Sequence, residues 1–202
     1  MLRLRSGLLP RLWQAGLAEY DGMQGIAWEW QSIDGAMGKA PLARECVGPN
    51  PTDRGKKKGR KRSLLVDGRG VPLSLVASGA NVHDVKLLAP TLDQTVLPRP
   101  DPDPEQAQHL CADAGYQGQS ASQAVAARHY QPHIKGRKQE AEEKREQPGW
   151  RARRWVVERS HSWFNRYRKL LVSFEKTEAS YIALLSLAAA SISWRQTITI
   201  YG

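Results

Sequence analysis

The chain has 202 residues, enough for one domain with a buried core or for one domain with a short extension. Its formal net charge is +10 and its sequence pI is about 9.9. The charge is clustered, which favours a nucleic-acid partner over a generally basic protein. Cys46 and Cys111 have no metal-ligand spacing, so a structural zinc site or a disulfide framework is not expected. The longest apolar run, 181–194, is too short to cross a bilayer.

The chain is expected to divide into two parts. Residues 1–27 are interpreted as an N-terminal helical remnant, because apolar side chains between Leu8 and Leu17 recur at roughly helical spacing. Residues 28–202 are expected to form the main domain, which begins with a strand at 28–34.

A glycine- and proline-rich segment that turns strongly basic follows this strand. It predicts a basic loop at 48–62, flexible until it contacts phosphate. The alternatives are a solvated loop or a run that mimics a nuclear localisation signal. A β-hairpin comes next, because 63–66 and 71–76 flank the turn sequence Asp67-Gly-Arg-Gly70.

The second half of the chain alternates helical and strand patterns. The predicted elements are a helix from Asn81 to Leu92, an acidic loop at 98–107, a strand at 108–113, a helix at 119–129, a strand at 131–135, a charged stretch at 136–149, and helices at 150–171 and 177–195. A hairpin followed by β–α alternation predicts an α/β protein with a mixed β-sheet flanked by helices. This order suits a ribonuclease-H-like fold.

Three carboxylates occupy positions where a charge is costly to bury. Asp34 and Asp113 each end an apolar strand, and Glu158 lies within an arginine-rich helical segment. In the predicted fold the first and fourth strands end side by side, and a helix after the fifth strand crosses near both. The three carboxylates can therefore meet, and together they would form a magnesium site for phosphodiester chemistry.

Each carboxylate also has a structural alternative. Asp113 could cap a turn, and Asp34 could end its strand in a simple turn. Glu158 falls opposite the apolar stripe of its helix, where it could pair with Arg154 and His161 on a solvated polar face. We expect instead that this cation-lined face lets Glu158 meet phosphate and metal together.

Five segments of the chain resemble the DDE transposases of bacterial insertion sequences, most closely those of the insertion-sequence-five type. The segments occur in the family's order, and the resemblance covers residues 17–195. They are Gln31–Ala36, Gly48–Gly55, Lys61–Leu73, Leu110–Tyr116 and Arg153–Arg166.

The resemblance implies that Asp34, Asp113 and Glu158 bind two magnesium ions, which manganese can replace, in a catalytic domain that cuts DNA and transfers the strand. It also implies a dimer on DNA, with transposon ends and target DNA as partners. In related groups a signature around the glutamate contains tyrosine and lysine, where this chain has Arg151 and Asn165. We expect a bacterial cytoplasmic protein associated with the nucleoid.

DNA contacts are predicted for two groups of cations. They are Arg54, Lys56, Lys57, Lys58, Arg60, Lys61 and Arg62 in the basic loop, and Arg151, Arg154 and Arg166 near the proposed site.

Members of this family usually carry a helical domain that recognises the DNA end ahead of the catalytic core. Only residues 1–27 precede the first predicted strand, so the chain is expected to be a truncated copy or the second product of a split reading frame. The N-terminal product of the upstream frame would then be a partner. The alternative functions are a relic that binds DNA without cutting it, and a structure-directed nuclease on the same fold.

Overall fold

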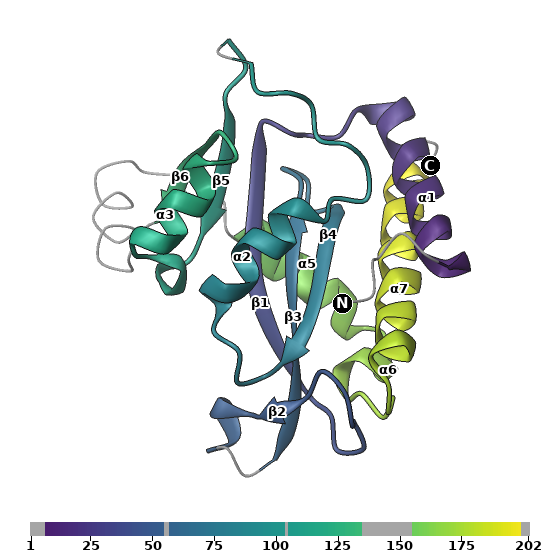
Figure 1. Ribbon diagram of the computed structural model, residues 1–202. Helices are drawn as coiled ribbons and strands as arrows, with labels where there is room; N and C mark the ends of the chain where they lie inside the picture. Colours follow the sequence, from purple (N-terminus) through teal and green to yellow (C-terminus); the bar gives the residue numbers. More distant parts are fainter. Residues whose placement is uncertain (1–6, 55–56, 104, 135–154, 199–202) are drawn as a thin grey trace.

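The computed structural model describes residues 7–54, 57–103, 105–134 and 155–198. A six-stranded mixed sheet organises this part of the chain (Figure 1). The strands are β1 (Trp30–Lys39), β2 (Gly48–Pro49), β3 (Lys58–Val66), β4 (Pro72–Gly79), β5 (Gln108–Ala112) and β6 (Tyr130–Ile134).

The strand order explains why the first and fourth predicted strands meet. β4, β3, β1, β5 and β6 lie side by side, and the short β2 pairs with the beginning of β3. β3 runs antiparallel to β1 and β4, whereas β1, β5 and β6 run parallel. The mixed sheet, and the adjacency of β1 and β5 within it, confirm the predicted ribonuclease-H-like fold.

Helices cover both faces of the sheet and one edge. They are α1 (Leu8–Gln24), α2 (Asp84–Asp93), α3 (Gln119–Ala126), α5 (Trp155–Asn165), α6 (Arg168–Leu171) and α7 (Glu178–Ile198), with 3-10 turns η1 (Pro51–Asp53) and η2 (Ala114–Tyr116). In Figure 1, α2 lies in front of β3 and β4, α5 lies behind the sheet, and α1 and α7 pack side by side next to β4. None of the described helices is long and apolar enough to cross a membrane.

The predicted N-terminal helix is present and belongs to the same core as the sheet. Trp13, Leu17 and Tyr20 of α1 are fully buried in the apolar cluster that also contains the centre of β3. The hairpin turn fastens this helix to the sheet. Asp67 accepts hydrogen bonds from the Tyr20 hydroxyl (2.9 Å) and from the backbone N–H of Val71 (2.8 Å).

Three predicted elements differ from the structure. The strand predicted at 28–34 does not end at Asp34, because β1 continues to Lys39 in pairing with β3. The basic loop 48–62 is wrong over its second half, because residues from Lys58 onward belong to β3. The single helix predicted at 150–171 is two helices: α5 ends in a tight turn in which Arg166 N–H bonds Trp163 O (3.2 Å), and α6 then begins at Arg168. Residues 150–154 and the charged stretch from 136 to 149 lie outside the described residues.

Candidate functional site

The three predicted carboxylates lie around one small pocket. Side chains alternate between the faces of a strand, and Ser32 pairs with Cys111 across the parallel strands β1 and β5. Asp34 and Asp113, each two residues further on, therefore lie on the same face. This is the face that α5 crosses. The pocket, of about 40 Å³, is lined by Ile33, Asp34, Asp113, Val157 and Glu158.

Asp34 lies at the centre of this acidic group. Burial raises the pKa of its carboxyl from 3.8 to about 6, because a charged carboxylate loses hydration there. A hydrogen bond from the Gly35 N–H opposes this shift, whereas the negative charges of Asp113, Asp84 and Glu158 add to it. The pocket therefore concentrates negative charge that a bound cation would relieve.

Asp113 has a local structural role as well. Its side chain accepts a hydrogen bond from Gly115 N–H (2.8 Å) and so caps η2, as the turn alternative predicts. The same half-buried carboxylate lines the pocket with Asp34. The cap holds Asp113 at the end of β5, so the two interpretations are compatible.

Glu158 lies in the first turn of α5, exposed to solvent, while Val156, Val157 and Phe164 of the same helix are buried. This agrees with the predicted packing stripe. His161 was predicted to lie with Glu158 on a cation-lined polar face. This prediction is wrong, because His161 is buried. Burial and the charge of Arg62 lower the pKa of this imidazole to about 3, so it is neutral near pH 7.

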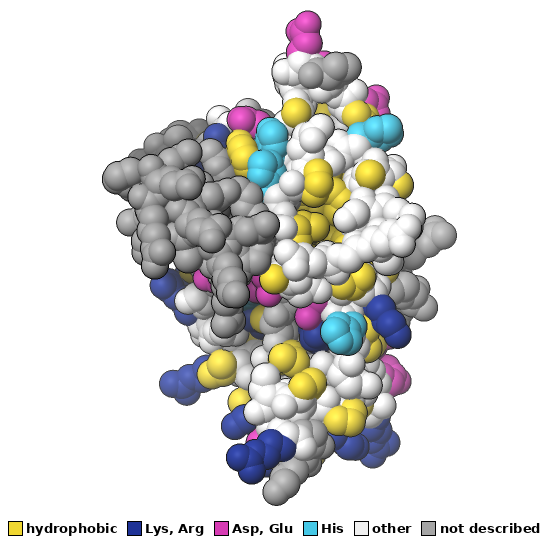
Figure 2. Space-filling view, turned by 90° about the vertical axis from the view of Figure 1, so that its left-hand side faces the viewer, with side chains coloured by type: hydrophobic (Ala, Val, Ile, Leu, Met, Phe, Trp, Pro, Cys, Tyr) yellow, Lys and Arg dark blue, Asp and Glu magenta, His cyan; other side chains and the backbone are white. Residues whose placement is uncertain are grey.

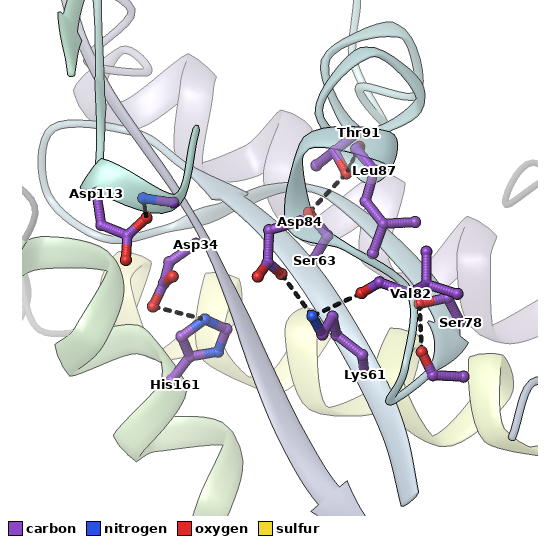
Figure 3. A network of polar contacts seen from close by, with 12 residues as sticks. Asp34, Lys61, Ser63, Ser78, Val82, Asp84, Leu87, Thr91, Asp113 and His161 are labelled. Carbon is purple, nitrogen blue, oxygen red and sulfur yellow. Dashed lines mark hydrogen bonds and ion pairs between the residues drawn. The ribbon is translucent and has the colours of Figure 1, made fainter. Parts of the chain in front are cut away.

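His161 connects the pocket to the interior. Its Nε2 faces Asp34 Oδ2 at 3.8 Å, as Figure 3 shows. On its other side, Arg62 Nε donates a hydrogen bond to His161 Nδ1 (3.2 Å). The position of His161 behind Asp34 is not visible in the sequence, because helical periodicity indicates the direction of a side chain and not how deeply it is buried.

Asp84 is a fourth carboxylate near Asp34, and the sequence does not reveal it. It approaches β1 from the opposite face of the sheet and does not line the pocket, but its negative charge helps to raise the pKa of Asp34. It begins α2, and its Oδ1 forms an ion pair with Lys61 Nζ (2.9 Å), which also bonds Val82 O (2.7 Å) (Figure 3). The backbone of β1 approaches Asp84 so closely that a Cβ at Gly35 would overlap the carboxylate. The segment before Asp84 predicted only the start of a helix. A local pattern of this kind does not indicate that Asp84 lies near Asp34.

The predicted DNA contacts divide into three groups. Arg54, Lys57, Lys58 and Arg166 are exposed, and their contact with DNA stays a prediction. Lys56, Arg151 and Arg154 lie outside the described residues. Arg60, Lys61 and Arg62 are corrected: their exposed fractions are 1%, 5% and 4%, because β3 is paired on both sides and covered by helices.

The buried cations are bound to protein groups. Arg60 donates to Glu45 O (2.9 Å), Ser173 Oγ (3.0 Å) and Thr177 O (3.2 Å). Arg62 also donates to His161 O (3.2 Å) and Asn165 Oδ1 (2.8 Å). Figure 2 shows the side of the molecule that lies on the left in Figure 1. On this side most Lys and Arg side chains gather over the lower half, towards the end that carries β2.

The donor set suits a hard divalent cation, because the three pocket side chains supply only carboxylate oxygens. Across the residues that the structure describes, no group of three or more His, Cys, Asp or Glu is already arranged to hold a metal ion. The oxygen ligands and the repulsion among the pocket carboxylates therefore favour binding of a cation. The three side chains do not by themselves form a closed coordination shell.

Comparisons with known proteins show which family the chain resembles. Residues 32–192 match the family model described as Transposase DDE domain. A protein of Burkholderia cepacia, named as a transposase for insertion sequence element IS402, is 35% identical over 160 residues, which cover 75% of this chain and 70% of that protein.

Two solved structures are also similar to the chain. They are a Mos1 mariner paired-end complex with Mn and the catalytic domain of the Mos1 mariner transposase, with TM-scores of 0.47 and 0.46 and 10% identity to each. Each alignment covers 99% of this chain, and the chain spans 62% of the first structure and 92% of the second.

Proposed function

Because the chain belongs to the transposase DDE domain family, we propose that its pocket carboxylates carry the metal-dependent cleavage and joining of DNA at the ends of an insertion sequence. One observation supports this proposal above the others. Asp34 from β1, Asp113 after β5 and Glu158 from α5 are far apart in sequence, yet they line one pocket.

Asp34, Asp113 and Glu158 are the residues that would hold the cations. We propose two magnesium ions, with manganese as a substitute; manganese is named with the Mos1 complex. Bound there, such ions supply Lewis-acid activation of the attacking oxygen and stabilise the leaving oxygen of the phosphodiester.

The protein contributes alignment and charge to this reaction. The cap on η2 and the partial burial of Asp34 within β1 restrain two carboxylates on adjacent strands, so little reorganisation is needed when charge develops. Within the proposal, DNA phosphates contact exposed cations; of the described residues these are Arg54, Lys57, Lys58 and Arg166.

The proposed partners are DNA ends and target DNA, bound by a dimer, since joining requires that two DNA segments be held together. The proposed place of action is the bacterial nucleoid. The exposed cations of this chain suit such a polyanionic partner.

The experiment is a cleavage and strand-transfer assay on DNA that carries the insertion-sequence ends, with Mg²⁺ or Mn²⁺. We expect Asp34→Asn, Asp113→Asn and Glu158→Gln each to lower the rate by at least about 10³-fold, because each removes a charged ligand of the reacting centre. DNA binding, measured in parallel, should persist in all three variants.

Glu19→Gln is the matched control, because this exposed glutamate lies on α1 and does not line the pocket. Full activity in any of the three pocket variants would contradict the proposal. Cutting without joining in the wild-type protein would indicate a structure-directed nuclease, and binding without cutting would indicate a relic.

A further inference from the structure

Arg62 is a buried guanidinium whose charge has no partner of opposite sign in direct contact. Among the described residues, no carboxylate forms an ion pair with it. Its donors are directed at neutral groups, those of α5 and the Tyr181 hydroxyl of α7, and its guanidinium carbon lies 5.4 Å from the centre of the Phe164 ring. A buried cation of this kind is costly unless its field is compensated nearby. Beyond His161 lies the acidic pocket that contains Asp34.

The hydrogen bond from Arg62 also fixes the tautomer of His161. A guanidinium can only donate, so His161 Nδ1 must be the acceptor. The neutral imidazole then carries its proton on Nε2. This atom is buried, has no hydrogen-bond partner in the structure, and faces Asp34 Oδ2 at 3.8 Å. An N–H group therefore faces Asp34, whose Oδ2 lies 3.8 Å away and whose backbone also interacts with the imidazole.

We propose that Arg62 and His161 form a positioning pair that orients the Asp34 carboxylate for divalent-cation binding. The inference rests on the proposed function of the pocket. Arg62 holds the imidazole in one tautomer and one rotamer, and His161 directs its Nε2–H at Oδ2 of Asp34. The other oxygen of Asp34 is thereby left for the pocket.

The pair also accounts for the position of Arg62 in β3. Arg62 pairs with Ala36 of β1, so its side chain projects to the sheet face of Asp34 and α5. Arg60, two residues earlier, projects to the same face and is equally buried. It donates instead to two backbone carbonyls and to Ser173 Oγ, and its guanidinium carbon lies 4.7 Å from the centre of the Tyr181 ring. The two arginines therefore provide a matched comparison within one strand.

The test measures the affinity of the DNA-free protein for Mn²⁺, by calorimetry and by the electron paramagnetic resonance signal of unbound Mn²⁺. His161→Phe keeps the size of the ring but removes both nitrogens, and Arg62→Met removes the charge and the donors. We expect each to weaken Mn²⁺ binding by about tenfold or more, as the loss of such supporting contacts does at other metal sites.

His161→Gln should retain affinity within about threefold, because its amide offers an oxygen to Arg62 and an N–H to Asp34. This rescue separates positioning from a general loss of packing. Arg60→Met is the control for the loss of a buried arginine: it should lower the midpoint of urea unfolding without changing Mn²⁺ affinity. If Arg62→Met does not fold, the contrast between His161→Phe and His161→Gln decides alone.

Two failures can be distinguished. Wild-type affinity in His161→Phe, or an equal loss in His161→Phe and His161→Gln, would overturn the positioning role while leaving the metal site intact. If instead the wild-type protein binds no Mn²⁺, or Asp34→Asn binds it as tightly as wild type, the proposed function of the pocket fails, and the inference fails with it.

Discussion

One basic run contains two groups of cations with opposite environments. Arg54, Lys57 and Lys58 are exposed to solvent, and the side chain of Lys57 is 67% exposed. Arg60 and Arg62, a few residues later, are 1% and 4% exposed and hydrogen-bonded within the protein. The difference arises where β3 becomes a strand paired on both sides. Residues of the same charge thus become surface cations or parts of the core according to their place in the sheet.

Alternation along β3 divides the buried group once more. Arg60 and Arg62 project towards α5, α6 and α7, where Arg62 supports the pocket through His161. Lys61 projects to the opposite face and pairs with Asp84 of α2. A basic run in a sequence therefore indicates how many cations are present. Which groups each cation contacts depends on the face of the sheet to which its side chain points.

The largest effect is expected from removing a buried cation. Arg60→Met should lower the free energy of unfolding by about 3 kcal/mol, because it leaves two carbonyl oxygens and a buried hydroxyl without their donor. Lys57→Met is the exposed counterpart and should change stability by less than about 0.5 kcal/mol. Urea unfolding measures both, and equal effects would remove the distinction between the two groups.

The second effect is the pH dependence of stability that the raised pKa of Asp34 produces. The folded-state pKa of Asp34, about 6, is above its usual 3.8, so the folded protein binds a proton that the unfolded chain releases. Its contribution to stability is therefore present below about pH 4 and is lost as the pH rises through 6, by roughly 2 kcal/mol. Unfolding of the metal-free protein across this range should show the decline, and Asp34→Asn should flatten it. A decline of the same size in Asp34→Asn would assign the effect to other groups.

Local patterns were sufficient for the elements and for the three pocket residues. The apolar runs that end at Asp34 and Asp113 predicted two strands, and the strand order placed these strands side by side. The predicted strand end at Asp34 is wrong, because β1 continues to Lys39. The basic loop failed because β3 begins with cations, so its first residues lack the apolar alternation that identifies a strand. His161 and Asp84 depend on contacts between distant elements. Helical periodicity predicts which way the His161 side chain points but not that it is buried. The helix start at Asp84 does not indicate which residues of the sheet lie next to it.

The smallest effect on stability should accompany a clear effect on DNA binding. Lys57→Ala combined with Lys58→Ala removes two exposed cations that precede the part of β3 paired with β1 and β4, so the free energy of unfolding should change by less than about 0.5 kcal/mol. If both contact phosphate, the slope of log affinity against log salt concentration should become shallower by roughly 0.9 for each lost contact. Filter binding over a range of salt concentrations measures this slope. An unchanged slope would mean that the exposed half of the run is solvated rather than DNA-bound, and the contrast with Arg60 and Arg62 would then be one of burial alone.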